Sequence, residues 1–411
     1  MRTLAVFALL AVSAGTALAA PYPGDIVQYW NLRTTWSINA TNPRQGGYYE
    51  AYAGAFVQTA ILAAAQDASR HPRAVQQLSV SYAAHDALAS LYDLQYQTID
   101  SYLTEIEDII TPTSSESSIA RRIGESAAAK VTRARAGDGY GRYKRYEWQA
   151  PAPGVYQPTP PNNPFPAAQH GGQLRPWGGV EKVPEWGPPP SPTDDGYEKF
   201  LLQVKEKGSK TNSTRTADET EIGYFWLESS ITAWNRYATT IIGDSLKDSV
   251  LKSAEFYAKL NWALANAAIV STHTKNKYNA WRPITALHYP GVFLKSGNSL
   301  RDPSWEPLFP NPGHQDYLSG HAVFGGSAVE VLRNHLGSDE LDPPVTLTSH
   351  VMFNNVGPIS RTFTSLSQAA KENGDSRVFV GVHFQFASDE GTKAGEAAAK
   401  QVLRRKGRGY L

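Results

Sequence analysis

An arginine and a histidine near the C-terminus, Arg377 and His383, have types and a spacing that suggest chemistry. They lie six positions apart in residues 376–383, which read SRVFVGVH. An arginine can clamp an oxyanion with two parallel N–H groups, and a neighbouring imidazole can act as a nucleophile or a ligand. The pair could therefore converge on one anion at the start of a helix, although the pair alone is a weak signal.

Two cations in a second stretch, KNKYNAWRP, strengthen this interpretation. Lys275 and Arg282 are seven residues apart, which is about two turns of an α-helix, so a helix over this stretch would place both on nearly the same face. Pro283 is expected to stop that helix. Solvated surface charge is the alternative for any such pair taken alone.

A third stretch, Ser319-Gly320-His321, precedes the apolar run AVFGGSAVEVLRNHLG. The run predicts a helix, so Ser319 and Gly320 lie at its N-terminus, where unpaired amide groups and the helix dipole favour an anion. His321 lies beside them as a possible proton donor.

Together the three stretches supply three cations, a hydroxyl group, a helix N-terminus and two imidazoles. By average residue usage each pattern arises by chance in roughly one chain in twenty to thirty, so all three together are expected in roughly one in ten thousand. Three neighbouring cations also repel one another, by about 4 kcal/mol per pair at 4 Å and an effective dielectric near 20. The combination predicts a site for a tetrahedral oxyanion.

The remaining sequence predicts an all-α fold of two packed helical bundles with little or no β-structure. Apolar residues at helical spacing predict helices over 48–69, 74–111 and about 115–135. Capping-box patterns at 216–219 and 245–248 predict two further helix starts, the second helix running to about residue 280. We expect another helix to open at Ser360-Arg361, and a last one over about 390–404.

A proline-rich stretch divides the chain. Of the 27 prolines, 13 lie between Pro151 and Pro192, interleaved with aromatic residues, which favours an ordered surface strap over a loose tether. We therefore predict a signal peptide over 1–19, an N-terminal helical part over 20–140, the strap over 141–200 and a catalytic helical part over 201–411, with the helical parts in one compact unit.

Composition excludes several classes of function. The formal charge of +1 gives no reason to expect nucleic acid as a partner, and the absence of cysteine excludes thiolate metal sites and cysteine nucleophiles. The first 19 residues read as a signal peptide ending near Ala19, so the protein is expected to be secreted to the extracellular space, or to the periplasm of a bacterium. No later apolar run is long enough to span a membrane, so the mature protein is not expected to do so.

The three stretches resemble the tripartite signature of the vanadium-dependent haloperoxidases and the related type 2 phosphatidic acid phosphatases. The looser resemblance runs from about Thr214 to the end of the chain, and the proline-rich strap resembles that of the haloperoxidase-like branch. The resemblance implies a bound vanadate cofactor, at a site that phosphate or sulfate also fits.

Each motif residue then has an implied role. His383 would bond the vanadium through a ring nitrogen. The cations Lys275, Arg282 and Arg377, with Ser319 and the Gly320 amide, would bind the vanadate oxygens. His321 would be the acid–base group, and Lys275 would also polarise bound peroxide. The resemblance thus implies that catalysis depends on His321, Lys275 and His383. It implies that the cofactor is held by Lys275, Arg282, Ser319, Gly320, Arg377 and His383.

The implied reaction oxidises a halide with hydrogen peroxide to hypohalous acid, which then halogenates a small organic acceptor. His314 stands seven residues before His321, where chloroperoxidases of the family usually have phenylalanine and algal bromoperoxidases have histidine. This favours bromide or iodide, and a structural role for His314 outside the halide pocket is the alternative. Leu318 departs from the proline that commonly precedes Ser-Gly-His, which predicts a less rigid loop without loss of a ligand.

Two other functions are compatible with the same residues. In an exported acid phosphatase His383 would accept the phosphoryl group and His321 would protonate the leaving group. A non-catalytic oxyanion-binding protein is the third possibility. The length of the chain and the strap favour the haloperoxidase.

Overall fold

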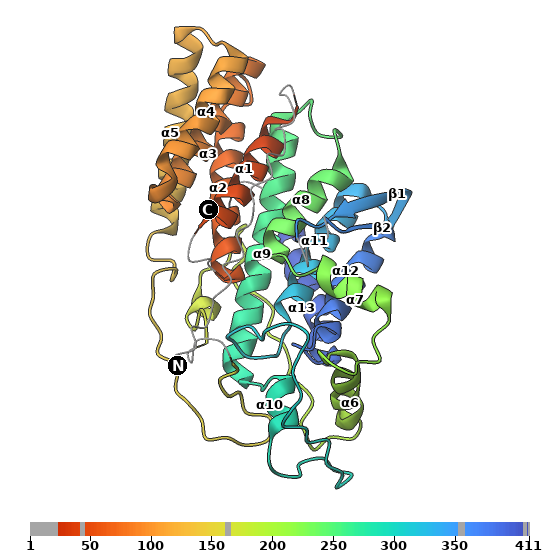
Figure 1. The fold of residues 1–411 in the computed structure, drawn as a ribbon. Coiled ribbons are helices and arrows are strands. Elements are labelled where there is room, and N and C mark those ends of the chain that lie inside the picture. The colour runs from red at the N-terminus through yellow and green to blue at the C-terminus, as the bar shows by residue number, and fades with distance from the viewer. Residues whose placement is uncertain (1–23, 42–45, 161–165, 352–357, 406–408, 410–411) are drawn as a thin grey trace, which may run out of the picture.

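The protein is mostly helical, as a computed structural model shows for residues 24–41, 46–160, 166–351, 358–405 and 409 (Figure 1). The expected all-α class is confirmed, since the β-structure of these residues is one two-stranded antiparallel sheet and two isolated bridges. The predicted signal peptide lies outside the described residues. Within them, no helix combines the length and the apolar character needed to cross a membrane.

The regular elements follow one another in the order shown in Figure 1. Their bounds are α1 Ile26–Ala40, α2 Gly47–Asp67, α3 Arg73–Leu91, α4 Tyr96–Ile110, α5 Ser114–Arg135, α6 Tyr197–Lys207, α7 Ala217–Phe225, α8 Ser230–Ile242, α9 Val250–Tyr278, α10 Pro283–His288, α11 Gly320–Leu336, β1 Glu340–Thr348, β2 Ser360–Ser365, α12 Leu366–Phe379 and α13 Gln385–Arg404. Two single 3₁₀ turns lie at Asp93–Gln95 and Gly171–Gln173.

The long helix α9 is the central element of the fold. It packs against α2 on one side and against α11 and α13 on the other (Figure 1). Every residue from Leu260 to Ser271 is buried, and a helix that is buried on all sides lies in the interior of the protein. The apolar side chains of both bundles form one continuous core around it. The predicted domain boundaries at residues 140 and 200 stay a prediction.

The described residues of the proline-rich strap, 141–160 and 166–196, are held against α9 and the loop that follows it. The Trp177 amide donates to Asn266 Oδ1 at 2.8 Å, and Asn266 Nδ2 donates back to the Trp177 carbonyl at 3.1 Å. Further along, the Trp281 amide donates to the Gly154 carbonyl at 2.9 Å. Prolines cannot donate ladder hydrogen bonds, so side chains and amides of α9 and its C-terminal loop hold the strap instead. The strap ends where α6 begins, at Tyr197.

Three helix predictions are wrong in detail. The single helix over 74–111 is two helices, α3 and α4, because the chain breaks at Tyr92 and the Asp93 side chain bonds the next amide, which competes with helix formation. The helix predicted from the box at 245–248 begins only at Val250, where Ser249 caps the Lys252 amide.

The helix predicted at Ser360-Arg361 is instead β2. Its sequence, SRTFTS, alternates around the fully buried Phe363, and β-branched threonines favour a strand. Cross-strand hydroxyl bonds join Thr346 to Thr362 and Thr348 to Ser360, each at 2.8 Å. Helix α12 starts only after this strand, with Ser365 as its N-cap.

A histidine between two carboxylates links α3 to α4. His85 Nδ1 lies 2.9 Å from Asp86 and its Nε2 lies 2.7 Å from Asp100. Burial opposes the charged ring, but the hydrogen bonds and charges of the two carboxylates outweigh it and raise the pKa of His85 above its usual value. The raised pKa makes this contact depend on pH.

Replacing His85 with glutamine is expected to destabilise the protein only at acidic pH. A raised folded-state pKa contributes stability below the unfolded value near 6.5, and this contribution disappears as pH rises through the folded pKa. The loss is expected to be about 1 kcal/mol or less, because both carboxylates are more than a third exposed. Urea unfolding of both proteins between pH 5 and pH 9 measures it. A difference that grows with pH would contradict this assignment.

Candidate active site

Lys275 and Arg282 meet at the C-terminal end of α9, but they do not share one helix face. Lys275 lies in the last turn of α9, which ends at Tyr278 before Asn279 adopts a left-handed conformation with φ of 47°. Arg282 is extended and precedes α10, in which Pro283 takes the first position. The prediction that Pro283 stops the helix that carries Lys275 is therefore wrong, because α9 has already ended at Tyr278. Pro283 instead occupies the first turn of α10, a position that suits proline.

Backbone carbonyl oxygens hold both cations. Lys275 Nζ donates to the carbonyl oxygens of Gln315 at 2.6 Å and Asp316 at 3.0 Å. Arg282 is fully buried and donates to the carbonyl oxygens of His314 at 2.8 Å and Val382 at 2.5 Å. The two side chains thus connect the end of α9 to the loop before α11 and to the loop before α13.

Arg377 and His383 lie on either side of a tight turn between α12 and α13. Arg377 is in the last turn of α12, and its carbonyl accepts from the amides of Val382 at 3.0 Å and His383 at 3.3 Å. Both side chains are buried. The expected position at the start of a helix holds for His383, which stands two residues before α13, and not for Arg377.

The Ser-Gly-His stretch lies where the sequence predicted, at the N-terminus of α11. Ser319 is the N-cap, yet its side chain caps no amide, and its buried hydroxyl has no partner within the described protein. The Ser319 amide donates to the Ala387 carbonyl of α13 at 2.9 Å. His321 is partly exposed, and its Nε2 lies 3.2 Å from the Glu228 carbonyl oxygen. Leu318 is fully buried despite the lost proline.

His314 borders both the buried cations and a cavity. Its Nδ1 lies 2.9 Å from Arg282 Nη2. A cavity of about 120 Å³ is lined by Lys275, His314, Gly320 and three aromatic side chains, Tyr48, Tyr49 and Phe324. His314 therefore contacts Arg282 and also forms part of the cavity wall, so the structure is compatible with both roles considered for it.

A buried carboxylate, Asp316, completes the cluster and was missing from the sequence prediction. Its Oδ1 lies 2.8 Å from His383 Nδ1 and 4.0 Å from Arg282 Nη1, and its side chain is fully buried. Nothing in the loop GHQDYLSGH distinguishes this aspartate from a surface residue. Only its place five residues before His321, in the same loop as His314, was a signal.

The buried charges strongly influence one another. Burial and the charge of Arg282 lower the pKa of Arg377 to about 9. Burial and then the charge of Arg282 lower the pKa of Lys275 well below its usual value. Asp316 raises this pKa, but by less. Burial also raises the pKa of Asp316 to about 7, against the opposing effect of Arg282, Lys275 and the Phe384 amide.

Both inner imidazoles are held in the neutral form. Burial, together with Arg282, Lys275, Arg377 and His314, lowers the pKa of His383 well below its usual value. The pKa of His314 is also lowered well below the usual value, first by burial and then by Lys275 and Arg282. A neutral imidazole retains the lone pair that a ligand or nucleophile needs.

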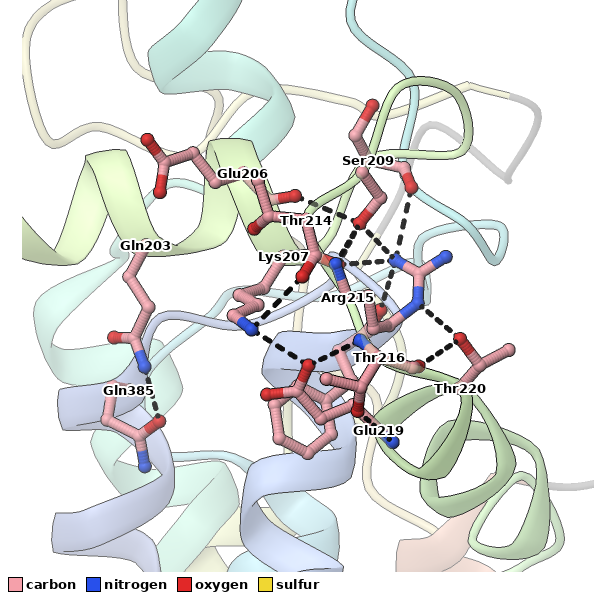
Figure 2. A network of polar contacts seen from close by, with 12 residues as sticks. Gln203, Glu206, Lys207, Ser209, Thr214, Arg215, Thr216, Glu219, Thr220 and Gln385 are labelled. Carbon is pink, nitrogen blue, oxygen red and sulfur yellow. Dashed lines mark hydrogen bonds and ion pairs between the residues drawn. The ribbon is translucent and has the colours of Figure 1, made fainter.

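An arginine network anchors the turn that carries His383 (Figure 2). Arg215 donates to the carbonyl oxygens of Ser209 at 3.1 Å and Phe379 at 3.0 Å. Gln203 of α6 bonds Gln385 at the start of α13, at 3.2 Å. The predicted capping box of Thr216 is present and follows directly. Both ends of the turn are thus tied to α6 and to the loop between α6 and α7.

One glycine of this turn, Gly381, lets its backbone approach its neighbours closely. Gly381 has a φ of +79°, and a Cβ atom there would collide with the Gly208 carbonyl and come within 2.9 Å of Pro307 Cβ. The Val380 carbonyl accepts from the Phe309 amide at 3.2 Å. The position of His383 therefore depends on Gly381.

The arrangement fits a tetrahedral oxyanion such as vanadate. Three cations, Lys275, Arg282 and Arg377, are buried beside one carboxylate, so positive charge is in excess. Arg377 Nε and Nη1 and the hydroxyl of Ser319 have no hydrogen-bond partner within the described protein. Buried charges and donors without partners cost stability, and an oxyanion bound among them would satisfy both. Gly320 lines the adjoining cavity.

Comparison with known proteins agrees with this geometry. Residues 255–408 match the family described as the VCPO second helical-bundle domain. Vanadium chloroperoxidase of Curvularia inaequalis is 25% identical, over 39% of this chain and 31% of that protein. The resemblance to the vanadium-dependent haloperoxidases is confirmed. The matched part spans all three predicted motifs, and the chain covers about a third of the length of this relative.

Solved structures extend the similarity of fold to nearly the whole chain. A bacterial vanadium-dependent iodoperoxidase aligns over 94% of this chain and 98% of its own, with a TM-score of 0.76 and 20% identity. A bacterial vanadium-dependent chloroperoxidase aligns in its apo form over 94% of this chain and 95% of its own, with a TM-score of 0.64 and 16% identity. Its holo form aligns over 96% and 95%, with a TM-score of 0.61 and 16% identity. These likenesses establish the helical haloperoxidase fold.

Replacing Gly381 with alanine is expected to destabilise the protein and weaken anion binding. The strain of a left-handed residue costs about 1–2 kcal/mol, and overpacking against Gly208 and Pro307 adds about 1–3 kcal/mol. Gly337 is the matched control, because its φ is +73° and no atom lies within 4 Å of a Cβ there. Urea unfolding and phosphate titration test both variants. Equal losses of stability in the two would contradict the packing argument.

Proposed function

We propose that the protein is a vanadate-dependent haloperoxidase that uses hydrogen peroxide to oxidise a halide, with bromide or iodide favoured, to hypohalous acid. The observation that carries the proposal is the set of three buried cations around the neutral imidazole of His383. This set accommodates an oxyanion and offers a nitrogen lone pair to its central atom. Similarity to proteins described as a vanadium iodoperoxidase and vanadium chloroperoxidases supports the same reaction class.

Several side chains and one amide offer hydrogen-bond donors to the oxyanion. Lys275 spends two of its three N–H donors on backbone carbonyls, which leaves one for the oxyanion or for peroxide. Arg377 offers two donor atoms, Nε and Nη1, that have no partner within the described protein and are available to an oxyanion. Ser319 and the Gly320 amide add donors at the N-terminus of α11, where the helix dipole favours negative charge.

Proton transfer is assigned to His321. The ring stands next to Gly320, is partly exposed, and is oriented by the Glu228 carbonyl, so it can exchange protons with both the site and solvent. Vanadate, when bound, supplies a Lewis-acidic centre that activates hydrogen peroxide without changing its own oxidation state. The cavity beside Lys275 and His314 gives peroxide, a halide and a small organic acceptor a route to the site.

The halide preference rests on His314. Its imidazole is part of the cavity wall, and its lowered pKa keeps it uncharged. A neutral ring with an N–H group can contact a large, polarisable halide without adding a further charge. The signal peptide predicted from residues 1–19 extends the proposal to a protein that acts outside the cytoplasm.

Two parallel assays test the proposed reaction. Protein reconstituted with vanadate is expected to brominate or iodinate a phenol-type acceptor with hydrogen peroxide, and to hydrolyse an aryl phosphate at most slowly. Activity on the aryl phosphate alone would replace the proposal with the phosphatase, in which His383 accepts the phosphoryl group. Inactivity in both assays, with phosphate still bound, would favour a binding protein.

Two histidine variants separate binding from turnover. His383→Ala is expected to abolish vanadate binding, because it removes the nitrogen proposed to bond the central atom. His321→Ala is expected to retain vanadate and to lower kcat about 100-fold or more, the size of effect typical of general acid–base groups.

His335→Ala is the matched control, because this histidine lies at the far end of α11 from His321. It is expected to change neither vanadate affinity nor kcat. Calorimetric titration with vanadate and steady-state halogenation kinetics measure the two effects. Normal activity of the His383 variant would show that the site is wrongly assigned.

A further inference from the structure

We propose that Asp316 is a positioning residue, which fixes His383 in the tautomer that presents the Nε2 lone pair to the oxyanion. The inference rests on the proposed function, because it concerns how vanadate is bonded. It adds a residue that neither the motifs nor the resemblance identified.

Two contacts of His383 demand the same tautomer. Its Nε2 lies 3.0 Å from Arg282 Nη1, and a guanidinium group has only donors. Nε2 must therefore accept, which places the proton of a neutral ring on Nδ1. That atom lies 2.8 Å from Asp316 Oδ1, so the negative carboxylate favours a proton there by electrostatic attraction, although the contact is not aligned as a hydrogen bond. The two neighbours hold the ring from opposite sides.

The backbone of Asp316 is rigidly placed. Its amide donates to the Ala280 carbonyl at 3.0 Å, and its carbonyl accepts from Lys275 Nζ at 3.0 Å. Its side chain is fully buried and also lies 4.0 Å from Arg282. One residue therefore contacts Lys275, Arg282 and His383, and so relates their positions to one another.

The tautomer decides which ring atom can bond. With the proton on Nδ1, Nε2 is basic and directed at the cluster of cations. If Asp316 were absent, Nδ1–H would lose the negative charge beside it, and the form with the proton on Nε2 would become populated. That form cannot donate a lone pair from Nε2 to the central atom of vanadate. Partners that orient a ligating histidine in this way typically change metal affinity 10- to 100-fold.

The test compares two anions that use His383 differently. Vanadate is proposed to bond Nε2, whereas inorganic phosphate needs only the cations and amide donors. Asp316→Ala is expected to weaken vanadate binding about tenfold or more, while phosphate binds as tightly as before or more tightly, because a negative charge has been removed. Calorimetric titrations of wild type and variant with each anion, in one buffer, give the ratio.

Asp138→Ala is the matched control. Asp138 is also a buried carboxylate, paired with Arg135 at 2.6 Å, and lies in the turn that follows α5, outside the site. Its loss is expected to lower thermal stability and leave the affinities for both anions unchanged. Equal weakening of both anions in Asp316→Ala would overturn the proposal in favour of a merely structural role. Stronger binding of both would leave only a charge effect, and would overturn it too.

A second measurement does not depend on the variant folding. Nitrogen-15 NMR of labelled histidines in the wild-type protein without added anion is expected to show His383 protonated at Nδ1, with its signals identified by their loss in His383→Gln. Protonation at Nε2 would overturn the proposal whatever the variants do. Wild-type protein that binds phosphate but no vanadate would instead refute the proposed function, and the NMR result would still show which tautomer His383 adopts.

Discussion

Three cations buried beside a single carboxylate impose the main physical constraint on this structure. At 4 Å a pair of like charges repels by about 4 kcal/mol at an effective dielectric near 20, and burial removes the water that would stabilise each one. The protein offsets part of this cost with backbone oxygens, which accept from Lys275 and Arg282. The part of this cost that the backbone oxygens do not offset favours a bound oxyanion. The repulsion that destabilises the site without an anion therefore also raises its affinity for one.

The same constraint explains why so much of the fold surrounds the site. The cations and imidazoles come from the end of α9, the loop before α11, the end of α12 and the turn before α13, and only rigid helices packed on one another can keep these segments in place. Arg215 and Gly381 extend this rigidity to the turn that carries His383. The strap, bonded to α9 through Asn266, covers part of the same helix.

Burial among cations also sets the chemistry of the imidazoles. A positive environment without water lowers the pKa of His383 and His314, so both rings keep a lone pair in the pH range where a solvated histidine begins to gain a proton. Asp316, whose own pKa is raised to about 7 mainly by burial, stands on the side of His383 opposite Arg282. The charges that attract an oxyanion thus also prepare the nitrogen that is proposed to bond it.

The sequence by itself determined the residue types of the site, the helical class and the N-terminus of α11, because the spacing of motifs and apolar residues records local geometry. It could not show that α9 ends before Arg282, at a left-handed Asn279. A proline at position 283 is compatible both with the end of one helix and with the first turn of the next. Nor did the local pattern decide between β2 and a helix, because it is the pairing with β1 that makes this short stretch a strand. The burial of Asp316 against His383 was decided only by tertiary structure, because long-range packing, and not local spacing, brings a loop carboxylate to a ring 67 residues later (383 − 316).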